Sequence, residues 1–119
     1  MGTLTQETLD EQGLVDPRRL AETFHITVKE LASAAGLAPE TVSKRSRRTA
    51  RNVQKRLREM VYILNRVESW CGSPFQAYAW YRSEPIPSLG DLTAEALVKA
   101  GKADLVNRYL DRIAEGGYA

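Results

Sequence analysis

The side chains best suited to covalent catalysis in this sequence are its single cysteine, Cys71, and its single histidine, His25. A thiolate and an imidazole base form a nucleophilic pair when the fold brings them together. Cys71 falls in a series of evenly spaced apolar residues, where a free cysteine usually acts as a small hydrophobic side chain. His25 stands between Phe24 and Ile26, which favours packing or helix capping. We therefore predict no Cys–His nucleophilic site.

Other catalytic and metal-binding patterns are missing from the sequence. It contains no phosphate-binding loop, no GxGxxG, no HExxH and no paired cysteines for zinc. The carboxylates of Asp104, Asp111 and Glu115 fall on the polar face of an amphipathic pattern. The sequence predicts a binding protein rather than an enzyme, with no metal and no cofactor.

A block of basic residues indicates a different chemistry, the binding of phosphate groups. Eight lysines and arginines occur within fifteen residues that contain no acid: Lys44, Arg45, Arg47, Arg48, Arg51, Lys55, Arg56 and Arg58. The formal net charge of the chain is only +2, because acids predominate in residues 1–22. Such a polarised distribution favours contact with nucleic acid.

Length and composition indicate the class of protein. The 119 residues fit one domain, or two very small modules that share a core. No apolar run approaches the roughly 18 residues that a membrane span requires, so we expect no membrane contact. The acidic, polar first residues do not resemble a signal peptide, and one cysteine fits a reducing compartment. We expect a cytoplasmic protein.

Capping signals predict an all-α fold. Residues 1–13 offer only two spaced apolar anchors and are interpreted as a frayed or short helix. Asp16-Pro17 begins a helix that runs to about Phe24 and buries one face. Residues 27–30 (TVKE) form a capping box, and the helix that they open stops at Gly36.

Pro39 begins a second helix, and the spacing of the pair is that of a helix-turn-helix. The shared core would consist of Leu31, Ala35, Leu37 and Val42. As a recognition helix, the second helix would present Thr41, Ser43, Lys44 and Arg47 to base edges or phosphates, while Arg48, Arg51 and Lys55 contact phosphate. Ala38 is a weak N-cap and Arg45 stands where an aliphatic residue is usual, so the end of this helix is not fixed.

The longest predicted helix spans Ala50–Cys71. Its apolar residues repeat by three and four: Ala50, Val53, Leu57, Met60, Leu64, Val67 and Cys71. Two interpretations are open. These residues form an apolar seam that pairs with the same seam of a second chain in a dimer, or they form the spine on which the smaller helices pack. The small size of the chain favours the spine for the half from Leu57 to Cys71.

The C-terminal part reads as three shorter helices. The Ser73-Pro74-Phe75-Gln76 capping box starts the first, in which Phe75, Ala79 and Trp80 should pack back on the spine. It ends at Pro85, before a Pro-x-Pro loop that closes at Leu89-Gly90. Thr93 caps a second helix, Ala94–Ala100, which Gly101 ends. An apolar stripe predicts a third helix over Asp104–Glu115.

This C-terminal order resembles the toxin-binding domain of the MbcA/ParS/Xre antitoxins, over about a third of the chain. The matching positions are Trp80, Arg82, Pro87, Leu89, Gly90, Thr93, Leu97, Ile113, Gly116 and Tyr118. Residues 16–48 resemble the Xre-like helix-turn-helix of the same group. The resemblance implies a helix-turn-helix region with the long spine helix in residues 1–72 and a small helical toxin-binding domain in residues 73–119.

The family implies a type II antitoxin whose partner is a RES-domain toxin that consumes NAD or uses it for ADP-ribosylation. Carried over to this chain, the toxin contacts would be Trp80, Arg82, Tyr109 and Arg112, with Gly116, Gly117, Tyr118 and Ala119 plugging the mouth of the NAD pocket. The other implied partner is operator DNA, bound by a homodimer or a higher complex with the toxin, so that the antitoxin regulates its own operon.

Two alternatives remain from the residues themselves. The chain could be a stand-alone repressor whose C-terminal helices only stabilise or dimerise it. It could also be an inhibitor whose helix-turn-helix has lost DNA binding, an alternative that Arg45 keeps open. The neighbouring gene distinguishes the stand-alone repressor from an antitoxin, because an antitoxin should lie beside its toxin.

Overall fold

The computed structural model describes residues 8–116, apart from the side chain of Arg45. This range is all-helical, as the sequence predicts, with a short 3-10 helix at Pro87–Leu89 and two isolated β-bridges. Its helices are α2 (Pro17–Phe24), α3 (Val28–Ala35), α4 (Pro39–Ser43), α5 (Arg45–Arg48), α6 (Arg51–Cys71), α7 (Pro74–Ser83), α8 (Ala94–Lys99) and α9 (Ala103–Gly116). No helix in the described range is long and apolar enough to cross a membrane.

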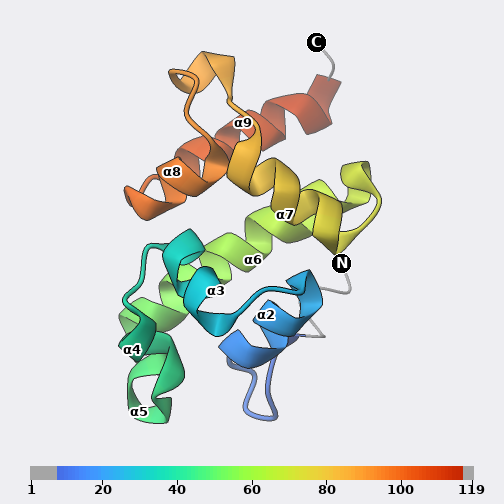
Figure 1. The fold of residues 1–119 in the computed structure, drawn as a ribbon. Coiled ribbons are helices and arrows are strands. Elements are labelled where there is room, and N and C mark those ends of the chain that lie inside the picture. Colours follow the sequence, from blue (N-terminus) through green and yellow to red (C-terminus); the bar gives the residue numbers. More distant parts are fainter. Residues whose placement is uncertain (1–7, 117–119) are drawn as a thin grey trace.

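Helix α6 is the spine of the molecule. It lies between the group formed by α2 to α5 and the group formed by α7 to α9 (Figure 1). The seam residues Val53, Leu57, Met60, Leu64 and Val67 are 0–3% exposed within the single chain. The spine interpretation is therefore confirmed. Because the chain's own helices cover the seam, it cannot pair with a second copy in this fold.

The helix starts of the N-terminal half follow from local hydrogen bonds. The Asp16 side chain accepts from the backbone N–H of Arg18 at 2.9 Å and caps α2. Thr27 and Glu30 form the predicted capping box, with the Glu30 N–H donating to Thr27 Oγ1 at 3.0 Å. Gly36 ends α3 at φ 72°, a conformation that glycine adopts without steric cost. These predictions are confirmed.

A turn precedes α2. Thr8 is helical, but Leu9 and Val15 pair in an isolated antiparallel bridge, so residues 9–15 form a turn and the short helix predicted within residues 1–13 does not extend past Thr8. Residues 1–7 lie outside the described part. The buried Gln54 of α6 anchors this turn. Its side-chain oxygen accepts from the N–H of Val15 at 2.9 Å, and its side-chain nitrogen donates to the carbonyls of Val15 and Arg48 at 3.0 and 2.9 Å.

The predicted recognition helix is interrupted. Helix α4 ends at Ser43, Lys44 has an extended backbone with φ −94° and ψ 127°, and Arg47 belongs to the separate four-residue helix α5. Between Val42 and Ala50 the sequence offers no apolar side chain that could hold another turn against the core. Like charges three and four positions apart in this segment also disfavour a continuous helix.

The inward face of α7 differs from the prediction. We expected Phe75, Ala79 and Trp80 to pack back on the spine. Trp80 is half-buried against the core, but Phe75 is 59% exposed and Ala79 is exposed. The buried residues are Ala77, Tyr78 and Tyr81 instead. Aromatic side chains occur around most of this helix, so apolar spacing alone does not determine which side faces inward.

The remaining C-terminal elements match the sequence to within one or two residues. Thr93 caps α8 by accepting from the N–H of Ala96 at 3.1 Å. An isolated bridge between Ile86 and Leu92 closes the preceding loop. The tyrosines of α7 join this half to α2, since the rings of Phe24 and Tyr78 stack with centroids 4.9 Å apart. One continuous apolar core thus contains residues from both halves of the chain.

Candidate binding surfaces

The C-terminal helices are held by hydrogen bonds to the end of α3. The Tyr81 hydroxyl donates to the Ala34 carbonyl at 2.9 Å, and Arg56 Nη1 of α6 donates to the Ala35 carbonyl at 2.9 Å. The last carbonyls of a helix have no partner within it and need one from elsewhere. Helices α7 and α6 therefore cap α3. Burial raises the pKa of Tyr81 far above its ordinary value, so its hydroxyl keeps its proton.

The turn after α3 also touches α8. A Cβ atom added at Gly36 would lie 2.9 Å from Arg56 Nη1 and 3.0 Å from Lys99 Cγ. Glycine is thus required here for space as well as for its positive φ. The turn between α3 and α4 is thereby packed directly against the C-terminal group of helices.

An ion-pair cluster connects α7 with α8. Glu95, which is 8% exposed, accepts from Arg82 Nε at 3.0 Å and lies 3.8 Å from Lys99 Nζ. The hydrogen bond to Glu95 raises the pKa of Arg82. Arg82 was predicted as a toxin contact, and the structure assigns it this internal role, although 44% of its side chain remains exposed.

A pair of exposed aromatic residues marks the corner between α6 and α7. Trp70, at the end of α6, is 50% exposed, and Phe75, at the start of α7, is 59% exposed. Only the short turn around Gly72 separates the end of α6 from the start of α7 (Figure 1). Large aromatic side chains are typical anchors of protein interfaces, because they bury much apolar area at a small cost in conformational entropy.

The other predicted toxin contacts occupy several positions. Trp80 and Tyr109 are half-buried and pack against the core, Arg112 is exposed, and Gly116 is the last residue of α9. Gly117, Tyr118 and Ala119 lie outside the described residues. Within the described part, no hydrogen bond, ion pair or ring contact joins Trp80, Tyr109 and Arg112.

Arg66 of the spine makes polar contacts with helix α9. Arg66 donates to the Asn107 carbonyl at 3.3 Å, and its Nη2 lies 2.9 Å from Asp111 Oδ1. Its guanidinium also lies 5.8 Å from the centroid of the Tyr62 ring, which is 56% exposed. Arg66 thus orders a surface that runs from α6 onto α9.

The predicted DNA contacts form two groups. The exposed residues are Ser43, Lys44, Arg47, Arg51 and Lys55. Thr41 is half-buried and its hydroxyl donates to the Ala38 carbonyl at 2.6 Å, and Arg48 is half-buried. Of the exposed cations, only Lys55 makes an ion pair within the described chain, at 3.9 Å from Glu59.

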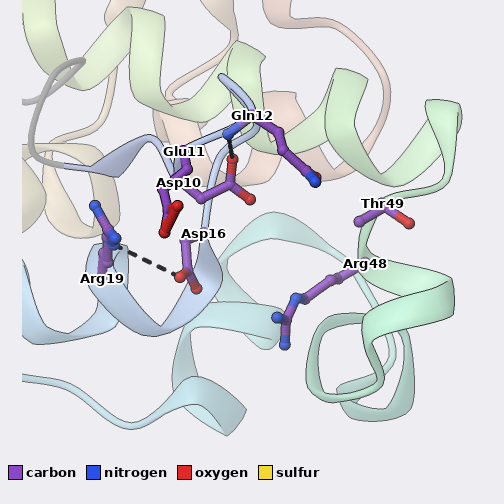
Figure 2. Close-up of a pocket in the computed structure, with 7 residues that line it drawn as sticks. All are labelled: Asp10, Glu11, Gln12, Asp16, Arg19, Arg48 and Thr49. Carbon is purple, nitrogen blue, oxygen red and sulfur yellow. Dashed lines mark hydrogen bonds and ion pairs between the residues drawn. The ribbon is translucent and has the colours of Figure 1, made fainter.

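Arg48 faces the acidic N-terminal turn. Arg48 lines a hollow of about 250 Å³ together with three carboxylates and a second arginine, Arg19 (Figure 2). The lining residues are Asp10, Glu11, Gln12, Asp16, Arg19, Arg48 and Thr49. This negative charge lies beside the basic segment, so Arg48 is less available to phosphate than the exposed cations are.

Sequence reasoning missed Trp70, Tyr62 and Arg66 as surface residues. A usable signal was the position of Trp70, which stands off the apolar seam although it is large and apolar. The candidate nucleophile Cys71 ends α6, where burial raises the pKa of its thiol and keeps it protonated. His25 is the exposed C-cap of α2 at φ 58°, as the capping interpretation predicted.

Comparison with known proteins identifies the C-terminal region. Residues 66–116 match the family model described as the antitoxin Xre/MbcA/ParS C-terminal toxin-binding domain. No curated protein and no solved structure matched the chain. The matched range begins at Arg66 and includes the aromatic corner, the Arg82–Glu95 pair and all of α9. Residues 66–116 are thus a C-terminal toxin-binding domain of the Xre/MbcA/ParS antitoxin family, a domain that binds a toxin and is not an enzyme.

Proposed function

We propose that the chain is the antitoxin of a RES-type toxin that consumes NAD or transfers ADP-ribose from it. The observation that carries the proposal is the match of residues 66–116 to the antitoxin toxin-binding domain. The RES class comes from the resemblance of the C-terminal motifs, whose partners in the family are toxins of this kind. The antitoxin would act by binding the toxin and covering its NAD pocket.

The aromatic corner supports a protein partner for this domain. Trp70 and Phe75 present large apolar surfaces to solvent, while the scaffold beneath them is fixed by stacked tyrosines and by the bond from Tyr81 to α3. A rigid scaffold lowers the entropy lost on binding, which favours affinity. We propose that this corner anchors the toxin, with Tyr109 and Arg112 of α9 at the edge of the same interface.

The end of α9 fits a second element of the proposal. Gly116 is exposed, and the chain continues through Gly117 and Tyr118 to Ala119. Glycines allow a backbone to enter a narrow cleft, and a tyrosine adds a rigid contact with one polar tip. We propose that residues 116–119 approach the mouth of the toxin's NAD pocket.

A DNA-binding role is proposed for the N-terminal half, on the strength of the exposed cations. Lys44 precedes α5, Arg47 lies on α5 and Arg51 is the first residue of α6, and none of the three makes an ion pair within the described chain. Because α4 is only five residues long, phosphate contacts should outweigh base reading. Binding to the chain's own promoter should weaken steeply with salt, and Lys44→Ala with Arg47→Ala should abolish any preference for a palindromic site. Salt-insensitive binding would refute this role.

The experiment that tests the antitoxin function is co-expression of the full chain with the product of the adjacent gene, followed by pull-down and an assay of NAD consumption. We expect a stable complex in which NAD loss is suppressed. The double variant Trp70→Ala and Phe75→Ala should weaken the complex, whereas Glu22→Ala, an exposed residue of α2, should not. Absence of a complex, together with tight promoter binding, would favour a stand-alone repressor.

A further inference from the structure

An apolar groove outside the aromatic corner is lined by three parts of the chain. It has a volume of about 520 Å³, within the range of sites that hold a ligand or a peptide segment. Its lining residues come from the N-terminal turn, α6 and α9: Leu9, Gly13, Val15, Lys55, Arg58, Glu59, Val61, Tyr62 and Asn107. The groove is apolar inside and cationic at its edge.

The groove is continuous with the toxin-binding domain. Arg51, Lys55, Arg58, Tyr62 and Arg66 follow one another on α6 in steps of four, three, four and four, so they form one strip along the helix. The strip ends at the first residue of the matched domain, where Arg66 lies over the Tyr62 ring. Asn107 of α9 belongs to the domain and to the groove lining alike.

The charges of the groove indicate the chemistry of its occupant. Arg58 is exposed and makes no ion pair with any described residue, while Glu59 is already shared by Lys55 and Arg56 at 3.9 and 3.6 Å. The cationic edge therefore favours a carboxylate on the occupant. A rim charge of this kind contributes to partner choice and to the association rate.

The wall of the groove contains one polar residue of α9, Asn107, whose side-chain oxygen lacks a partner among the described residues. The side-chain oxygen of Asn107 is buried and has no hydrogen-bond partner within the described chain, although its nitrogen donates to the Ala103 carbonyl at 3.3 Å. A buried acceptor without a partner costs free energy until a donor reaches it.

We infer that the toxin contacts this antitoxin beyond residues 66–116, by inserting an acidic, amphipathic segment into the groove between the N-terminal turn and α6. The inference rests on the proposed toxin-binding function. Apolar side chains of the segment contact Val61 and Tyr62, and its carboxylates pair with Arg58 and Lys55. Because Lys55 is also among the proposed DNA contacts, toxin and DNA compete for it.

The test measures the Kd of the complex with the adjacent-gene product for the full chain and its variants. Arg58→Glu reverses the exposed rim charge and Tyr62→Ala removes the exposed ring, so neither change disturbs the core. Arg18→Glu is the matched control, an exposed cation of α2 outside the groove lining. We expect each groove variant to raise Kd by about tenfold and the control to leave it within about twofold.

Each outcome decides between the claims. If the wild type binds and both groove variants bind equally well, the inference is wrong and the antitoxin function stands. If the wild type does not bind the adjacent-gene product, the proposed function fails and the inference fails with it. If the free wild type sediments as a dimer and Tyr62→Ala as a monomer, the groove holds a second copy of the chain instead, which also overturns the inference.

Discussion

Replacing Tyr81 with phenylalanine removes one oxygen atom and nothing else from the centre of the molecule. The side chain is 0% exposed, and its hydroxyl donates to the Ala34 carbonyl at 2.9 Å. The phenylalanine ring retains the packing of the tyrosine ring. The variant therefore isolates one hydrogen bond that connects α7 of the toxin-binding domain with the C-terminus of α3.

The expected loss of stability follows from what remains after the substitution. Because folding replaces hydrogen bonds to water, one intramolecular hydrogen bond adds only about 0.5–1.5 kcal/mol to stability. A buried acceptor left without a partner, however, costs about 1–3 kcal/mol. The Ala34 carbonyl is near the helix end, where no further turn supplies an N–H. We expect the free energy of unfolding to fall by about 1–3 kcal/mol, with Tm falling by roughly 4 °C per kcal/mol for a chain of this size.

The assay is urea unfolding followed by circular dichroism, with thermal unfolding as a second measurement. Tyr62→Phe is the matched control, because that ring is 56% exposed and its hydroxyl is already open to water. The control should change stability by less than about 0.5 kcal/mol. Equal stability of Tyr81→Phe and Tyr62→Phe would refute the claim that α7 caps α3.

Three further predictions concern stability. Burial raises the pKa of Tyr78 and Tyr81, so the unfolded chain loses these protons at a lower pH than the folded chain does. The stability contributed by the two tyrosines should be fully present below pH 10.0, the ordinary tyrosine value, and should fall as pH rises above it. Urea midpoints that stay constant from about pH 8 to about 11 would contradict this prediction. Gln54→Leu should cost at least about 2 kcal/mol in urea unfolding, since it leaves the backbone N–H and carbonyl of Val15 without their partner. Gly36→Ala should destabilise more than Gly13→Ala, because both glycines have positive φ but only at Gly36 would the added Cβ meet Arg56 and Lys99; equal losses would show that the close packing is irrelevant.

Local signals were sufficient to predict most helix boundaries. Asp16-Pro17, the Thr27 capping box and Gly36 each act through hydrogen bonds or backbone geometry within a few residues, so the sequence contains them completely. The apolar seam of α6 could also be predicted, because its spacing of three and four residues is a property of a single helix. Its use as a spine rather than a dimer interface depended on how many other apolar faces the chain could supply.

Features set by contacts distant in sequence could not be predicted. The inward side of α7 depends on stacking between Tyr78 and Phe24 and on the bond from Tyr81 to Ala34, and neither partner is a neighbour in sequence. The N-terminal turn depends on Gln54, 39 residues further along the chain. At Lys44 no nearby apolar side chain anchors the segment to the core, so helix propensity and charge repulsion determine where the helix breaks.

The candidate site was only partly accessible from sequence for the same reason. The C-terminal motifs identified the toxin-binding region, and the family match confirms that identification for residues 66–116. The motif residue Arg82, however, proved to pair with Glu95, and the exposed aromatic residues Trp70 and Phe75 are not among the positions that match the family. Exposure of a large apolar side chain is a property of the packed molecule and becomes visible only there.

The most direct test of the central claim is hydrogen–deuterium exchange of the full chain, alone and bound to the adjacent-gene product. We expect new protection at the end of α6 and along α7 and α9, the helices that carry Trp70, Phe75 and Tyr109. Protection confined to α3, α4 and α5, with exchange in α7 and α9 unchanged, would contradict it.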